Sequence, residues 1–204
     1  MSEIIELGLD ERYTFRRLPG VLARLGIKPR GVVHVGAHLG EEVPVYDECG
    51  FDRVILVEPD VQRVEVIRNQ HPTVEVVHAA VASYEGVGQL WRGPRTYHDS
   101  LLESAGGDRG PTVRTALLAS LQEDCNVAVI DTQGTELEAL TTADLSRLDL
   151  LIIETIRWPH QLPAADRTAV GDYLAERGWA VVEEWQHDST GHTDSLFAPV
   201  VPRD

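Results

Sequence analysis

The stretch that decides the fold is Val32-Val33-His34-Val35-Gly36-Ala37-His38-Leu39-Gly40-Glu41, followed by Ile55-Leu56-Val57-Glu58-Pro59-Asp60. Each begins with a short apolar run, which predicts a buried β-strand. The first strand runs into a glycine turn before a predicted helix, and the second ends on a carboxylate, Glu58, 22 positions after Gly36. This layout is typical of a nucleoside site in an open α/β sheet. Glycines admit the ligand, a helix N-terminus receives its anionic end, and the carboxylate accepts hydrogen bonds from ribose hydroxyls.

Strands and helices alternate along the chain. The predicted strands are Gly31–Val35, Arg53–Val57, Val74–Val77, Val127–Ile130 and Leu150–Ile153. The predicted helices are Glu41–Cys49, with acidic residues in its first turn, a helix capped by Asp60 that runs to Gln70, one beginning at Thr135–Leu140, and Ala164–Arg177. Trp179–Trp185 and Ser195–Val200 predict a hairpin around residues 188–191. The pattern predicts an α/β fold: a mainly parallel sheet with a C-terminal antiparallel hairpin that adds an edge strand.

The remaining segments have weaker patterns. Gly86–Trp91 predicts a short additional strand, residues 92–110 a loop rich in glycine, and Val113–Leu121 a short buried helix, with an extended segment as the alternative. Apolar positions at helical spacing predict a helix over residues 11–26. Residues 1–29 are interpreted as a helical extension of a single domain that spans residues 1–204.

Composition excludes several classes of function. The net charge of −15 disfavours nucleic acid and anionic membranes as partners, and no apolar run is long enough to span a membrane. The acidic N-terminal residues lack an export pattern, which predicts a cytoplasmic location. The two cysteines make neither a disulfide framework nor a zinc site. No metal is expected, because the spacing of the acidic residues and histidines that flank the hairpin turn matches no metal signature: His187, Asp188, His192 and Asp194.

Four candidate site residues follow or end predicted strands: Gly36, Glu58, Asp131 and Glu154. The carboxyl ends of parallel strands meet at one edge of a sheet, and ligands bind there near the point where the strand order reverses. The sequence therefore predicts that these residues gather on a single edge.

The glycine run distinguishes between two kinds of nucleoside cofactor. Dinucleotide sites use Gly-x-Gly-x-x-Gly, and here His38 stands in place of the second glycine, where a side chain should obstruct a pyrophosphate. S-adenosylmethionine (SAM) has no pyrophosphate, and its methionine carboxylate needs only a turn and a helix start. The run favours SAM, with a dinucleotide oxidoreductase as the alternative.

Several motifs resemble, in order, those of the FkbM-type SAM-dependent methyltransferases. They are Val33–Gly40, Val57-Glu58-Pro59, the segment His78–Ser83 with Gly86, Ser100-Leu101-Leu102, and Ile130-Asp131-Thr132-Gln133-Gly134-Thr135-Glu136. The family reads Val-Asp-Val-Gly-Ala-Asn-x-Gly, then Val-Glu-Pro, a serine-leucine step, and Lys-Ile-Asp-Val-Glu/Gln-Gly-x-Glu. The resemblance covers about residues 30–200, and an ordered series of motifs is more specific than one motif alone.

The resemblance implies a Rossmann-like class I methyltransferase fold with SAM as the cofactor. It implies that Glu58 holds the ribose and that Asp131 lies beside the reacting methyl group. It also implies that Gly36, Ala37 and Gly40 form the turn at the methionine end and that Ala80 borders the adenine. Ser100 and Leu101 would close over the cofactor. His34 and His38 replace the family's aspartate and asparagine, and both are included in the predicted cofactor site. Ala128-Val129 replaces the family's lysine-containing approach to Asp131.

A hydroxyl acceptor needs a base near the reacting methyl group. The predicted catalytic residues are Asp131 and His98, which lies in the loop beside Ser100, with His160 as a weaker candidate. These features predict methyl transfer to a small-molecule acceptor, first of all O-methylation of a sugar or secondary metabolite. N-methylation and a non-catalytic nucleoside-binding module are the alternatives. The acceptor, the need for a metal and the oligomeric state, a homodimer included, stay open at this point.

Overall fold

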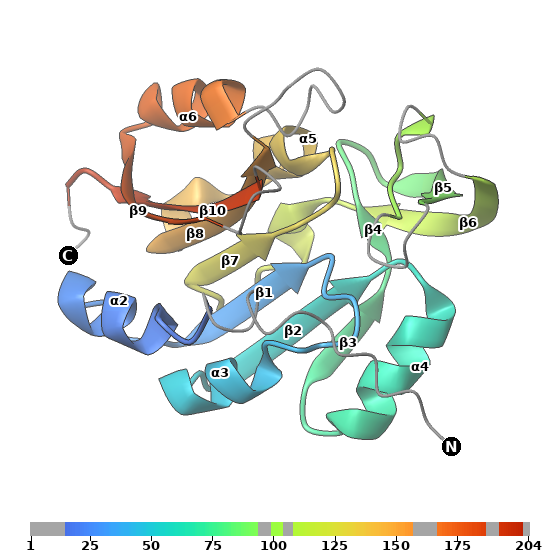
Figure 1. The fold of residues 1–204 in the computed structure, drawn as a ribbon, viewed down its shortest axis with the longest axis horizontal. Helices are drawn as coiled ribbons and strands as arrows, with labels where there is room; N and C mark the ends of the chain where they lie inside the picture. The colour runs from blue at the N-terminus through green and yellow to red at the C-terminus, as the bar shows by residue number, and fades with distance from the viewer. Residues whose placement is uncertain (1–14, 94–98, 104–107, 157–166, 187–191, 202–204) are drawn as a thin grey trace.

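A seven-stranded sheet is the centre of the protein in the computed structural model, which describes residues 15–93, 99–103, 108–156, 167–186 and 192–201 (Figure 1). From one edge to the other its strands are β3 (Glu75–His78), β2 (Arg53–Glu58), β1 (Gly31–Val35), β7 (Val127–Ile130), β8 (Leu150–Ile156), β10 (His192–Pro199) and β9 (Trp179–Gln186). β3, β2, β1, β7 and β8 are mutually parallel, and β10 is antiparallel to both of its neighbours. The predicted fold class, a mainly parallel α/β sheet with a C-terminal antiparallel hairpin, is confirmed.

The order of the strands reverses between β1 and β7. The chain moves outward from β1 through β2 to β3 and then returns to the other side of β1. Loops that leave two adjacent strands in opposite directions open a crevice at the carboxyl ends of those strands. Here these are the loops that begin at Gly36 and at Asp131.

Helices cover both faces of the sheet (Figure 1). They are α2 (Leu18–Leu25), α3 (Val43–Cys49), α4 (Val61–Gln70), α5 (Glu136–Thr141) and α6 (Arg167–Ala175), with two short 3₁₀ turns at Leu118–Ser120 and Leu145–Arg147. Buried residues of α2, α3 and α4 pack with Val32, Leu56 and Val129 of the sheet on one face. On the other face α5 and α6 pack with Val33 and Ile153. Each central strand is therefore apolar on both sides, as parallel strands of this class require.

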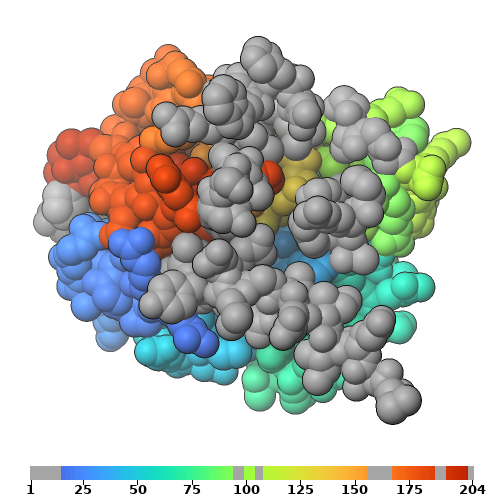
Figure 2. All heavy atoms as spheres, in the orientation of Figure 1, coloured from blue at the N-terminus to red at the C-terminus, as the bar shows by residue number. Residues whose placement is uncertain are grey.

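A second, three-stranded sheet was not anticipated. β5 (Gly86–Arg92) and β4 (Ala80–Val81) both pair with β6 (Asp108–Ala116), and the green and yellow-green atoms of the β5 and β6 region stand out at the right of Figure 2. The helix predicted over Val113–Leu121 is wrong, and the extended alternative is confirmed for residues 113–116, which belong to β6 and are followed by a 3₁₀ turn. The β-branched Val113 and Thr115 fit this strand, which pairs with the preceding strand β5.

Other details of the fold also differ from the prediction. The helix after β1 begins at Val43, so Glu41 and Glu42 precede it and do not fill its first turn. β8 continues to Ile156, which places Glu154 inside the strand, opposite Asp194 of β10. In the hairpin it is β9 that forms the edge, while β10 lies between β8 and β9. None of the helices in the described part of the chain is long and apolar enough to cross a membrane.

Candidate functional site

A cavity opens at the carboxyl ends of β1, β2 and β7, where the strand order reverses. It encloses about 570 Å³ of empty space, counting the part that is open to solvent. Seven of the residues predicted from the sequence line it: Gly36, His38, Glu58, Ala80, Ser100, Leu101 and Asp131.

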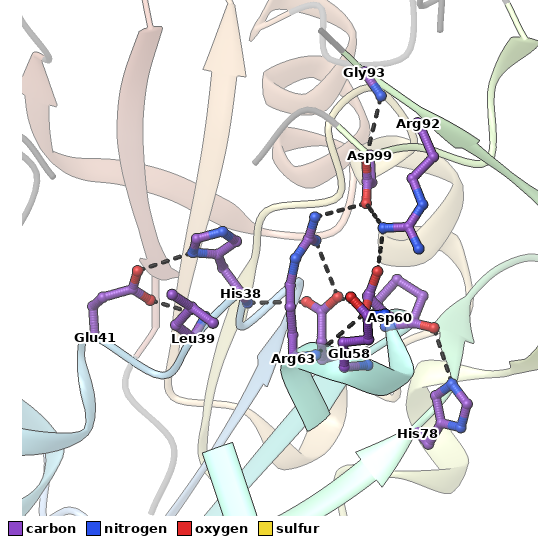
Figure 3. A network of polar contacts seen from close by, with 12 residues as sticks. His38, Leu39, Glu41, Glu58, Asp60, Arg63, His78, Arg92, Gly93 and Asp99 are labelled. Atoms are coloured by element: carbon purple, nitrogen blue, oxygen red, sulfur yellow. Dashed lines mark hydrogen bonds and ion pairs between the residues drawn. The ribbon is translucent and has the colours of Figure 1, made fainter. Parts of the chain in front are cut away.

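Glu58 is the last residue of β2, and only 2% of it is exposed. Its Oε1 accepts hydrogen bonds from the Asp60 N–H at 2.9 Å and from Arg63 at 3.2 Å, and its Oε2 accepts from the His38 N–H at 3.0 Å (Figure 3). Burial raises the pKa of Glu58 to about 7, while the Arg63 charge and the two N–H bonds act in the opposite direction. The carboxylate is thus held in one orientation, with its side chain in the cavity wall.

The glycine turn brings the loop after β1 close to Glu58. His38 occupies the left-handed region at φ 46°, a conformation more usual for glycine, and its Nδ1 lies 2.9 Å from Glu41. Ala37 and Gly40 belong to the same turn but do not line the cavity: Ala37 is packed in the core, and Gly40 lies against Leu56 and His71.

His34 lies outside the cavity, although it was included in the predicted cofactor site. Side chains alternate along a strand, and Val35 points to the cavity, so His34 points to the opposite face of β1. There it is 4% exposed, stacks on Phe15 and shares a 2.9 Å hydrogen bond between its Nδ1 and the Tyr46 hydroxyl. Burial lowers the pKa of His34 to about 4. In this structure the imidazole is a neutral core group.

Asp131 directly follows β7 and lines the cavity. Gln133 Nε2 donates to Asp131 Oδ1 at 2.6 Å and to Glu154 Oε2 at 2.8 Å, and Glu154 Oε1 in turn lies 3.0 Å from His192 Nδ1. Burial and the neighbouring Glu154 and Glu136 carboxylates raise the pKa of Asp131 well above its usual range. A carboxyl group with a raised pKa holds its proton more tightly, and it can accept a proton from an acceptor only after losing its own.

Glu136 shapes the loop that carries Asp131. The carboxylate is buried and accepts hydrogen bonds from the N–H groups of Thr132 at 2.9 Å and Gly134 at 2.9 Å. Between them, Gln133 is in the left-handed region at φ 56°. Glu136 lies in the first turn of α5 and also fixes the backbone beside the cavity.

An apolar wall closes the cavity on the side of the small sheet. Ala80, Leu90 and Val113 form a buried cluster there, and Leu101 packs against it. Ser100 is buried, its backbone exchanges two hydrogen bonds with Trp91 at 2.8 and 3.0 Å, and its Oγ accepts from the Leu102 N–H at 3.1 Å. The segment predicted to close over a cofactor is therefore tied to the end of β5.

Sequence reasoning missed two charged residues of the cavity, Arg63 and Asp99. Arg63 is the third residue of α4, where a positive charge opposes the helix dipole. A basic side chain at this position, five residues after a buried carboxylate, indicates an acidic partner and could have been noticed. Asp99 offered no comparable signal.

Several predicted residues lie outside the described part of the chain. They are His98, His160, His187 and Asp188. Within the described residues, no group of three or more His, Cys, Asp or Glu side chains is arranged to hold a metal ion.

No protein-family model matches the chain, and no curated protein matches it in sequence. Solved structures do match in fold. One is magnesium protoporphyrin IX methyltransferase from Synechocystis with bound S-adenosylhomocysteine (SAH), with a TM-score of 0.56 and 10% identity over 94% of this chain and 84% of that one. An rRNA methylase from Streptococcus thermophilus has a TM-score of 0.54 and 12% identity, over 96% of this chain and 99% of that one.

A third structure is a ribosomal protein methylase from Lactobacillus delbrueckii, with a TM-score of 0.53 and 14% identity over 95% of this chain and 80% of that one. At these identities the similarity defines the fold. The chain has the class I methyltransferase fold, and the three structures differ in the acceptor that their names state.

Proposed function

We propose that this protein is a SAM-dependent methyltransferase that methylates a small molecule, in the first place at oxygen. The observation that carries the proposal is the cavity at the β1–β7 crevice, with the Glu58 carboxylate in one wall and Asp131 in another. The ordered FkbM-like motifs support the same conclusion.

The residues present fit an adenosine. Glu58 Oε2 accepts one hydrogen bond within the described residues, from His38, and a carboxylate oxygen has capacity for a second donor such as a ribose hydroxyl. The apolar wall formed by Ala80, Leu90 and Leu101 offers a surface for a flat heterocycle. Adenosine would be held between Glu58 and this wall.

The amino-acid end of the cofactor would lie toward Gly36 and Asp131, where polar groups replace the apolar wall. SAM supplies an electrophilic methyl carbon bonded to a sulfonium, and its transfer leaves SAH. The protein's part is to orient the acceptor in line with that bond and to exclude water. Asp131 is proposed to take the proton that a hydroxyl acceptor loses, with Gln133 holding its carboxyl group in place. His98 remains a second proposed base.

The class of acceptor is argued from charge. Proteins of this fold act on porphyrin, rRNA or protein according to the names of the matching structures, so the fold does not choose among acceptors. A net charge of −15 repels a phosphate backbone, which favours a small molecule over RNA. N-methylation of a small molecule is the second candidate, because Asp131 and Glu154 would also attract a cationic amine.

Thermal unfolding with SAM, SAH and NADH separates this proposal from its rivals. We expect SAM and SAH to raise Tm by about 5–10 °C at about 100 times their Kd and NADH to leave it unchanged. A shift with NADH alone would favour a dinucleotide oxidoreductase. SAH formation is then measured against a panel of hydroxyl and amine compounds. Binding of SAH with no turnover on any compound of the panel would favour a non-catalytic module.

A further inference from the structure

Arg63 lies between two buried carboxylates that come from distant parts of the chain (Figure 3). Its Nη1 is 3.2 Å from Glu58 Oε1, and its Nη2 is 2.7 Å from Asp99 Oδ2. The Arg63 side chain is 12% exposed and that of Asp99 is 3% exposed. The two nitrogens of one planar guanidinium thus contact different carboxylates, and both contacts are largely shielded from water.

Asp99 leads directly into the segment that closes the cavity. Ser100 and Leu101 follow it, and both line the cavity. The Asp99 carboxylate also accepts the Gly93 N–H at 3.2 Å and pairs with Arg92 at 3.0 Å. Arg92 continues the network to Asp60, the N-cap of α4. The network therefore joins the start of α4 to the end of β5, and three of its members, Glu58, Arg63 and Asp99, line the cavity.

We propose that Arg63 is a positioning residue that couples the cofactor-binding carboxylate Glu58 to the Ser100–Leu101 wall of the cavity through Asp99. This inference rests on the proposed function. Within the network Arg63 is the cation that contacts both Glu58 and Asp99, since the contacts of Arg92 are with Asp60 and Asp99. Loss of Arg63 would release the wall segment and leave Glu58 as a buried carboxylate without its counter-ion.

The charge around Glu58 gives the inference a signature that a purely structural residue would lack. The charged and titratable groups around it are Arg63 and Asp60 at the start of α4, His38 after β1, and the Asp99–Arg92 pair from the side of β5. Arg63 lowers the pKa of Glu58 against the effect of burial. Without Arg63 the pKa of Glu58 would be higher. As the pH is lowered, Glu58 would therefore become protonated earlier, and the affinity for SAH would begin to decrease at a higher pH than in wild type. Asn at position 99 removes a negative charge instead and would not cause this upward shift.

The experiment is a double-mutant cycle on SAH affinity, measured by calorimetry from pH 6 to 9 with R63Q, D99N and the double variant. We expect Kd to rise about tenfold or more in R63Q and about three- to tenfold in D99N, with the double variant no weaker than R63Q. The pH midpoint of binding should move up in R63Q alone. R63K, which keeps the charge without the planar fork, should keep the wild-type midpoint but bind more weakly.

R68Q is the matched control, because Arg68 is exposed on the same helix and bonds only a backbone carbonyl among the described residues. Additive effects of R63Q and D99N on Kd, or affinities equal to wild type in both, would overturn the inference while leaving the proposed function intact. A wild-type protein that does not bind SAH would refute the proposed function itself. If R63Q does not fold, R63K and D99N still decide between coupled and independent effects.

Discussion

Gly36 lies so close to the main chain of Asp131 that a β-carbon at position 36 would stand 1.6 Å from the Asp131 carbonyl oxygen. Gly36 also has φ +81°, a conformation that other residues rarely adopt. The two loops of the β1–β7 crevice can therefore meet only because one of them begins with glycine. The position that the sequence assigns to the cofactor turn is thus also a requirement of the fold.

Replacement of Gly36 by alanine should unfold or severely destabilise the protein. We expect a loss of more than about 3 kcal/mol in the free energy of unfolding, from the backbone overlap and the strained φ together. Urea denaturation followed by circular dichroism measures this. Gly20→Ala is the control: Gly20 is exposed in α2, and no atom lies within 4 Å of the position that a β-carbon would take, so this variant should gain about 0.5–1 kcal/mol in the free energy of unfolding. A G36A protein of wild-type stability would contradict the geometry.

His34 is assigned here to the core, and Tyr46→Phe tests that assignment. The change removes the hydroxyl that pairs with His34 Nδ1 but keeps the aromatic packing. We expect a loss of about 1–2 kcal/mol in stability and a Kd for SAH within about twofold of wild type. Tyr84→Phe, at an exposed tyrosine, should change neither quantity. A large loss of SAH affinity in Y46F would indicate that His34 belongs to the cofactor site after all.

Glu42 makes the stability of the protein depend on pH. Burial and the charges of Glu41, Asp131 and Asp194 raise the pKa of Glu42 to about 8 from its ordinary value of 4.5. The folded state thus binds this proton more tightly than the unfolded state. The contribution of Glu42 to the free energy of unfolding is fully present below about pH 4.5, and it is lost as the pH rises through about 8. Glu42→Gln should therefore stabilise the protein by about 3 kcal/mol more at pH 9 than at pH 5.5.

The measurement is chemical denaturation at both pH values. Glu65→Gln, at an exposed carboxylate of α4, should have no such pH-dependent effect. Equal effects of E42Q at pH 5.5 and pH 9 would show that Glu42 does not titrate in this range.

Asp131→Asn tests the proposed base. Asparagine keeps the shape of the side chain but cannot accept a proton, so turnover should fall about a hundredfold or more while Kd for SAH changes only a few-fold. Because the pKa of Asp131 is raised by burial and by Glu154, wild-type turnover should increase with pH as Asp131 loses its proton. Steady-state kinetics over a pH series checks both expectations. Wild-type turnover in D131N would show that Asp131 is not the base, and His98 would then be the remaining candidate.

Much of the large sheet could be predicted because its signals are local. The apolar runs at β1, β2, β7 and β8 are bounded by turns, and each has the length of a buried strand. The predicted gathering of Gly36, Glu58 and Asp131 at one edge followed from the parallel order of those strands. β6 could not be identified from Val113–Leu121 alone, because its conformation depends on pairing with β5.

The parts of the site that escaped prediction depend on tertiary placement. His34 and Val35 are both buried, and a central parallel strand with two apolar faces carries no signal that says which face meets the ligand. Arg63 and Asp99 are 36 residues apart, and their ion pair arises only when the end of β5 comes near α4. Sequence patterns located the carboxylate of the site but not its counter-ion.

The central claim is that Glu58 binds the ribose of an adenosine cofactor, and calorimetric titration of SAH into wild type, E58A and E65A tests it most directly. The account predicts micromolar-range binding by wild type and by the surface control E65A, and no measurable binding by a folded E58A protein. A folded wild-type protein that does not bind SAH, or an E58A protein that binds it as tightly as wild type does, would contradict it.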